Sequence, residues 1–264
     1  MLYLCRKIEV VRLMEGRKYP LGIQTFENII KGNYVYVDKT ALVYQLIHEK
    51  KYCFLSRPRR FGKSLLVTTL QAYFEGRKEL FEGLAMEQLE QEWVSYPVIH
   101  LDLSKGKFYD LESLHVTLNS LLESYESLYS LHVEYEKAYN VRLQNIIEAA
   151  YAQTGKEVVV LIDEYDAPMH DSMKDQDLQV QIRDRMRNFF SPLKGEEKIL
   201  RFVFLTGISK FSQLSIFSEL NNITNISMLD KYSDICGISK DELLAHFEED
   251  VEALAEENEM TYEE

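Results

Sequence analysis

A glycine, a lysine and a serine follow one another between an apolar run and an apolar segment of helical period, and these residue types can bind phosphate. Gly62 permits a tight backbone turn in which successive N–H groups point at an anion. Lys63 can reach the β- and γ-phosphates of a nucleotide, and the hydroxyl of Ser64 can ligate Mg²⁺. A helix that begins at this point adds the positive end of its dipole. The pattern predicts a phosphate-binding loop (P-loop) that takes ATP and Mg²⁺ as cofactors.

The loop departs from the general P-loop pattern, G-x-x-x-x-G-K-[ST], at its first position. Arg57 stands where the first glycine is expected, and Pro58 follows it. Because Gly-Lys-Ser or Gly-Lys-Thr arises by chance in about one chain in ten of this length, an arginine-rich surface turn before a helix stays open as the alternative. On the P-loop hypothesis, the residues expected to contact the nucleotide are Arg59, Arg60, Phe61, Gly62, Lys63, Ser64 and Leu65.

Two carboxylates follow a second apolar run, which covers residues 158–162. A continuous run of Val, Leu and Ile is typical of a strand buried on both faces. Its carboxyl end lies at the sheet edge where ligands of open α/β folds bind. We expect Asp163 to hold Mg²⁺ together with Ser64, and Glu164 to act as the general base that activates the attacking water. The alternative is a pair of solvated acids at the end of a strand.

A hydroxyl follows a third apolar run, which ends at residue 205. Thr206 is the first choice for a side chain that contacts the γ-phosphate or positions water, and Ser209 is the second. An equally open alternative is a strand-ending turn whose hydroxyls satisfy backbone groups. The expected catalytic residues are therefore Glu164, Lys63 and Thr206.

Other polar residues near these motifs have two interpretations each. The three loop arginines could neutralise phosphate charge or reach another subunit as a finger. Asp166 could join the metal ligands, although a helix or turn cap is favoured. Asp38 and Lys39 could hold the outer edge of the nucleotide, although packing or a salt bridge is favoured.

Short apolar runs alternate with longer segments of helical period, and this pattern predicts a doubly wound α/β fold with a mostly parallel sheet. The expected strands are 52–56, 98–103, 158–163 and 202–206, with 223–228 as a weaker candidate and 34–37 as a short possible strand. The expected helices are 63–74, 111–125, 135–153 and 178–190.

The chain divides into three expected parts. Residues 1–40 form a lead-in that packs on the main domain, residues 41–232 form the P-loop domain, and residues 233–264 form an acidic helical segment. Ser239, with Glu242 three residues later, indicates a capping box that opens this helix. Leu243, Leu244, Phe247, Val251 and Leu254 form an apolar stripe along it. We expect the start of a truncated helical lid, and the alternative is a stripe that folds back on the core.

Composition excludes several classes of protein. No stretch approaches 18 consecutive apolar residues, so we expect no membrane span and a cytoplasmic location. The three cysteines are widely spaced and odd in number, which argues against a disulfide framework or a zinc site. The net charge of −13 arises mostly in residues 241–264, which hold eleven acidic residues and no Lys or Arg. The remaining chain is nearly neutral, so a nucleic-acid partner is not supported by this chain alone.

Three sequence runs, at residues 57–64, 163–168 and 206–211, resemble the bacterial AAA-ATPase-like family, and the resemblance covers residues 18–264. Residues 20–23 and 36–40 are similar to the start of such domains. The resemblance implies an AAA-related ATPase of the additional-strand, catalytic-glutamate class, in which the first P-loop glycine is commonly absent. Many members carry a restriction-endonuclease-like domain after the ATPase. No such nuclease core is apparent in this chain, so we do not expect it to cleave DNA.

Three functional hypotheses follow. The first is an ATP hydrolase that drives a conformational change in an attached or partner module, such as a C-terminal nuclease-like module or another protein. The second is a nucleotide-dependent switch or scaffold with little hydrolysis. The third, a nuclease-associated defence or mobile-element protein, rests on the family resemblance alone. An oligomer is compatible with each of them.

Overall fold

A single parallel sheet forms the centre of the protein, whose computed structural model describes residues 18–133, 135, 137–208 and 223–258. The sheet has five strands in the order β2-β3-β4-β1-β5, and each neighbouring pair is parallel. The strands are β1 (Tyr52–Ser56), β2 (Val98–Asp102), β3 (Val158–Asp163), β4 (Leu200–Gly207) and β5 (Thr224–Asn225). Because β4 lies between β1 and β3, the carboxyl ends of these three strands meet at one edge.

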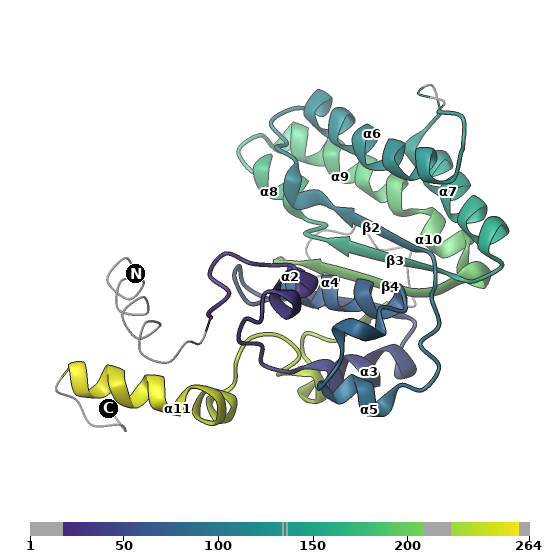
Figure 1. Ribbon diagram of the computed structural model, residues 1–264. Helices are drawn as coiled ribbons and strands as arrows, with labels where there is room; N and C mark the ends of the chain where they lie inside the picture. Colours follow the sequence, from purple (N-terminus) through teal and green to yellow (C-terminus); the bar gives the residue numbers. More distant parts are fainter. Residues whose placement is uncertain (1–17, 134, 136, 209–222, 259–264) are drawn as a thin grey trace.

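Helices cover both faces of the sheet (Figure 1). On one face lie α2 (Phe26–Lys31), α3 (Thr40–Glu49), α4 (Lys63–Phe74) and α5 (Ala85–Leu89). On the other lie α6 (Leu111–Leu128), α7 (Tyr139–Thr154), α8 (Ala167–Asp171), α9 (Gln176–Phe190) and α10 (Pro192–Gly195). Short 3-10 helices are η1 (Lys78–Leu80), η2 (Leu103–Lys105), η3 (Glu197–Ile199) and η5 (Asp230–Tyr232).

Strand β3 explains why the sheet needs two covering layers. All six of its residues are buried. Val158, Val160 and Ile162 belong to the core on one face, whereas Val159 and Leu161 belong to the core on the other. Each such side chain contributes about 1.5–3 kcal/mol of hydrophobic free energy when fully buried. The structure thus has an α/β fold with an all-parallel sheet, consistent with a P-loop type.

Several expected strands differ from the observed ones at their ends. The strand expected at 98–103 ends at Asp102, because the carboxylate of Asp102 accepts from the backbone N–H of Ser104 at 3.0 Å and starts η2. β4 extends beyond 202–206 in both directions, and β5 is confined to two residues of the expected 223–228. Within 34–37, Tyr34 forms an isolated bridge to Lys18 rather than part of a named strand.

Two expected helices begin elsewhere. The helix expected at 135–153 begins at Tyr139, after Ala138 in an extended conformation. The helix expected at 178–190 begins two residues earlier, because the side chain of Asp175 accepts from the backbone N–H of Leu178 at 3.0 Å as its cap. The helix expected at 111–125 continues to Leu128.

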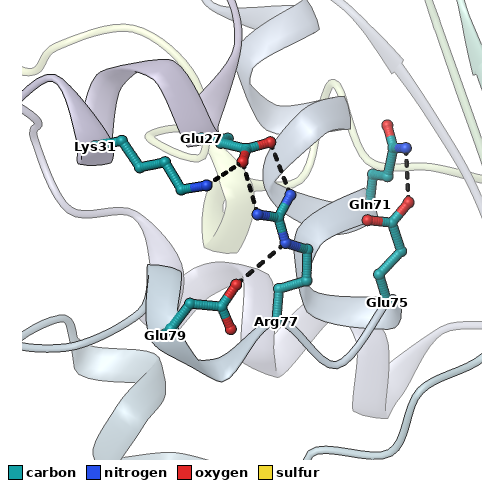
Figure 2. Close-up of polar contacts among 6 residues, drawn as sticks. All are labelled: Glu27, Lys31, Gln71, Glu75, Arg77 and Glu79. Atoms are coloured by element: carbon teal, nitrogen blue, oxygen red, sulfur yellow. Dashed lines mark hydrogen bonds and ion pairs between the residues drawn. The ribbon is translucent and has the colours of Figure 1, made fainter.

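The described part of the lead-in packs against α4 and the segment that follows it. Phe26 is fully buried and its ring lies 5.0 Å from that of Phe81. Figure 2 shows an ionic cluster beside this contact, in which both terminal nitrogens of Arg77 donate to Glu27 at 2.7 Å. Lys31 donates to the same carboxylate at 2.6 Å. Helix α2 is therefore fixed to the chain just after α4.

Helix α11 (Lys240–Glu257) extends away from the sheet (Figure 1). Its expected capping box is present, because Glu242 N–H donates to the Ser239 hydroxyl at 3.3 Å and Ser239 N–H donates to the Glu242 carboxylate at 2.8 Å. Phe247 has non-helical angles and kinks the helix. Among the described residues, none of the helices has the length and apolar character needed to cross a membrane.

Candidate functional site

The predicted P-loop lies between β1 and α4, where the sequence pattern places it. Gly62 takes a left-handed φ of 83° and is the N-terminal cap of α4. Arg60 also has a left-handed φ, of 67°. A non-glycine residue pays about 1–2 kcal/mol for this conformation. Arg59 and Phe61, on either side of Arg60, are exposed.

Lys63 is buried within this loop, with 4% of its surface exposed. Its ammonium donates to the carbonyl oxygens of Arg57 at 3.1 Å and Pro58 at 3.2 Å. A buried cation is costly unless it is hydrogen-bonded, and here two loop carbonyls supply the bonds. Ser64 is half-buried on the first turn of α4, directly after it.

Arg57, at the position of the first glycine in the general P-loop pattern, bonds to backbone carbonyls. Its guanidinium donates to the carbonyl oxygens of Ser227 at 2.8 Å and Ser233 at 3.3 Å. Its backbone N–H donates to the carbonyl of Gly207 at 3.2 Å. Arg57 thus ties the P-loop to β4 and to the chain after β5, through backbone carbonyls rather than through a carboxylate.

The acidic residues lie at the same edge of the sheet. Asp163 ends β3 with 3% of its surface exposed, and its carboxylate accepts a hydrogen bond from the hydroxyl of Thr206, which lies near the end of β4. The Thr206 hydroxyl oxygen also accepts from the backbone N–H of Glu164 at 3.3 Å. The three residues therefore form one hydrogen-bonded cluster. Ser209, the second choice for the hydroxyl, lies outside the described residues.

The pKa of Glu164 responds both to the acidic residue before it and to cations of the predicted P-loop. Burial and the neighbouring charge of Asp163 raise the pKa of its carboxyl, whereas Lys63 and Arg59 act in the opposite direction. Its φ of 51° places it in the left-handed region, immediately after the strand. A general base works best when its pKa approaches the operating pH, so the direction of this shift suits that role.

Asp166 bonds to the chain after β4 rather than capping α8. It occupies the N-terminal cap position of α8, yet its side chain makes no capping bond there. Its Oδ2 accepts from the backbone N–H of Ile208 at 3.0 Å and lies 3.1 Å from Nε2 of His170. The carboxylate is fully buried.

Asp38 and Lys39 make packing and ionic contacts, the interpretation favoured by the sequence. The carboxylate of Asp38 accepts from the backbone N–H of Thr40 at 2.8 Å and of Ala85 at 2.7 Å, which joins α3 to α5. Lys39 forms an ion pair with Glu242 at the start of α11.

An apolar cavity of about 410 Å³ adjoins the predicted P-loop, and no sequence pattern predicted it. Its walls come from the lead-in, from the P-loop and α4, from the chain after β5, and from α11. The residues that line it include Tyr36, Val37, Phe61, Leu65, Ile238 and Phe247. The only hints in the sequence are apolar residues at 35–37 and 235–238, which no periodic pattern connects.

The metal ligands expected from the sequence have suitable chemistry. A hydroxyl and a carboxylate oxygen are donors that Mg²⁺ accepts, and Mg²⁺ usually completes its shell with water and substrate phosphates. Asp163 is buried at the strand end and Ser64 lies in the P-loop. In the described ranges, no group of three or more His, Cys, Asp or Glu side chains could hold a metal ion without such outside ligands.

The family model described as Predicted AAA-ATPase (AAA-ATPase_like) matches residues 20–217. The chain belongs to the AAA-ATPase-like family. The match includes the predicted P-loop, the Asp163–Thr206 cluster and most of the sheet.

A protein of Azotobacter chroococcum mcd 1, described as an uncharacterized protein in the vnfD 5' region, is similar over most of this AAA-ATPase-like chain. The two are 38% identical over 245 residues, which is 91% of this chain and 47% of the relative. The chain thus spans about half the length of the curated relative that it matches.

Proposed function

We propose that this chain binds ATP and hydrolyses it with Mg²⁺. The observation that supports the proposal best is the position of Lys63, a buried ammonium that donates to two loop carbonyls at the edge where Asp163, Glu164 and Thr206 gather. Phosphate oxygens are better partners for an ammonium than neutral carbonyls, since charge-assisted hydrogen bonds are roughly twice as strong. ATP would therefore draw Lys63 away from the loop carbonyls.

Glu164 is the proposed general base. It would accept the proton of the attacking water while its backbone N–H stays bonded to Thr206. Thr206 would hold the carboxylate of Asp163 and so fix the relation between base and metal ligand. Ser64 and Asp163 would hold Mg²⁺, which neutralises charge on the phosphate oxygens.

The apolar cavity is the proposed site of the nucleotide base. It adjoins Gly62 and Leu65, so a base in the cavity would leave the phosphates at the loop. Aromatic side chains at Tyr36 and Phe61 and aliphatic ones after β5 offer flat and apolar surfaces for a purine. If the loop were only an arginine-rich surface turn, the presence of this cavity beside it would have no explanation.

The finer fold that we propose is a doubly wound, AAA-related P-loop domain with α11 as the start of a helical lid. Phe247 of α11 lines the cavity, and Lys39 pairs with Glu242 at its first turn. Binding of a base would thus be coupled to the position of α11. Turnover would drive a conformational change in an attached or partner module through this helix.

Titration of the full chain with ATP tests the proposal, with and without Mg²⁺ and for Lys63→Ala in parallel. The variant loses one charge-assisted contact worth about 1.5–3 kcal/mol, so its Kd should rise by about 10- to 100-fold. Arg59→Ala, which changes an exposed loop cation, should weaken binding less. Equal ATP affinity of wild type and a folded Lys63→Ala protein would rule the P-loop assignment out. Tight binding without phosphate release would favour the switch or scaffold.

A further inference from the structure

The turn after β3 is cross-linked to the end of β4 by a series of hydrogen bonds. The hydroxyl of Thr206 donates to the carboxylate of Asp163 and accepts from the backbone N–H of Glu164. The N–H of Tyr165 donates to the Thr206 carbonyl at 2.9 Å. In the last bond of the series, the carboxylate of Asp166 accepts from the backbone N–H of Ile208 at 3.0 Å. Each residue from 163 to 166 is therefore tied to β4 or to the chain directly after it.

Packing leaves little freedom between these bonds. A Cβ added at Gly207 would lie 2.5 Å from the ring of Tyr165 and 2.7 Å from Oδ1 of Asp166. The ring of Tyr165 is itself buried edge-on against Phe54 of β1, at 5.5 Å and 89°. A shift of the turn would therefore have to displace β1 or β4.

The carboxylate of Asp166 lies in the protein interior, close to other acidic residues. It is fully buried, and Asp163 and Glu164 bring two further negative charges to the same turn. A buried charge lowers stability unless hydrogen bonds compensate it, and like charges add to the cost. Oδ2 of Asp166 accepts a hydrogen bond from the backbone N–H of Ile208 and lies 3.1 Å from Nε2 of His170. The bond to Ile208 links the turn after β3 to the chain directly after β4.

We propose that Asp166 is a positioning residue for ATP hydrolysis, which fixes the turn carrying Glu164 by holding the backbone of Ile208. The inference rests on the proposed function. Glu164 has a left-handed φ. This conformation costs a non-glycine residue free energy, so it persists only where the surrounding structure holds it. Without Asp166, the turn relaxes and the Glu164 carboxylate loses its alignment with the attacking water. Lys63 lies on the separate P-loop, so ATP binding is retained.

The test compares kcat with ATP affinity in the full chain for Asp166→Ala, Asp166→Asn and Asp171→Ala. Asp171 is a matched control, because its carboxylate also accepts from a backbone N–H, that of Phe108 at 3.2 Å, at the other end of α8. Asp166→Ala should lower kcat at least tenfold and change the Kd for ATP by less than about threefold. Asp166→Asn keeps an oxygen for Ile208 and should recover most of the turnover. Asp171→Ala should match wild type.

The outcomes separate this inference from the proposed function. Wild-type turnover in a folded Asp166→Ala protein overturns the positioning role and leaves the ATPase intact. Asp166→Asn as slow as Asp166→Ala would mean that the charge matters and the bond to Ile208 does not, which also overturns it. If wild type releases no more phosphate than Lys63→Ala, the proposed function fails and this role fails with it. Unfolding curves of each variant identify any that does not fold, and Asp166→Asn then decides.

Discussion

Thr206 donates its hydroxyl hydrogen to the carboxylate of Asp163, from the neighbouring strand. The acceptor is the residue expected to hold Mg²⁺, and the same hydroxyl oxygen binds the backbone of the expected general base, Glu164. One side chain on β4 therefore links the last residue of β3 to the first residue of the turn after it.

Thr206→Val tests this relation with almost no change in volume. The variant leaves Asp163 and the N–H of Glu164 each without a described partner, so we expect the free energy of unfolding to fall by about 1–3 kcal/mol. Phosphate release should fall at least tenfold. Thr117→Val on α6 is the control, since its hydroxyl donates to the Ser113 carbonyl at 2.9 Å, within the same helix. Wild-type turnover in Thr206→Val would exclude Thr206 from the mechanism.

Arg57→Lys separates a structural role of Arg57 from contact with phosphate. Lysine keeps the charge but lacks the fork that reaches Ser227 and Ser233, so we expect a loss of about 1–3 kcal/mol of stability by chemical unfolding. The exposed Arg59, changed to Lys, should stay within about 0.5 kcal/mol of wild type. Unchanged stability with weaker ATP binding in Arg57→Lys would instead indicate a phosphate contact.

The ionic cluster of Figure 2 predicts a pH dependence of stability. Hydrogen bonds from Arg77, and next from Lys31, lower the pKa of Glu27 from 4.5 to about 2. A lowered carboxyl pKa stabilises the folded protein above pH 4.5, and this stabilisation is lost as the pH falls toward 2. Arg77→Met should therefore remove part of the fall in unfolding free energy between these pH values.

Lys31→Met serves as the control for that experiment, because Lys31 contributes less to the pKa shift of Glu27. Its pH profile should lie between those of wild type and Arg77→Met. Parallel profiles for wild type and Arg77→Met would show that the cluster has no linkage to folding.

The ion pair between Lys39 and Glu242 predicts a coupling between α11 and the body of the domain. Lys39→Met, Glu242→Gln and the double variant form a cycle, for which we expect a coupling energy of about 1 kcal/mol. The more exposed pair Lys231–Glu49 gives a comparison cycle, in which coupling should be undetectable. Hydrogen exchange of α11 reports the same effect, with faster exchange expected in both single variants. Unchanged exchange in α11 would remove the pair as its anchor.

The fold could be predicted where the residues carry a local signal. The left-handed Gly62 fixes the start of α4, and the continuous apolar run at 158–162 fixes β3, so both elements have the expected bounds. The capping box of Ser239 and Glu242 is equally local and is confirmed. Bounds that depend on a side-chain cap, as at Asp102 and Asp175, were wrong by one or two residues.

The rest of the site depends on contacts between distant segments. The cavity beside the P-loop joins residues as far apart as Tyr36 and Phe247, and no spacing in the sequence relates them. The link from Asp166 to Ile208 follows from strand order, which places β4 beside β3, and the sequence pattern could not give that order. Roles of individual residues in catalysis stay predictions.

Phosphate release by Glu164→Gln at saturating ATP and Mg²⁺ tests the central claim most directly. The amide keeps the shape of Glu164 but cannot accept a proton from water, so turnover should fall by about 10²–10⁴-fold while ATP affinity stays close to that of wild type. Glu157→Gln, which changes the acid just before β3, should leave both unchanged. Equal phosphate release by wild type and Glu164→Gln would contradict the account, because the residue at the centre of the proposed site would then take no part in hydrolysis.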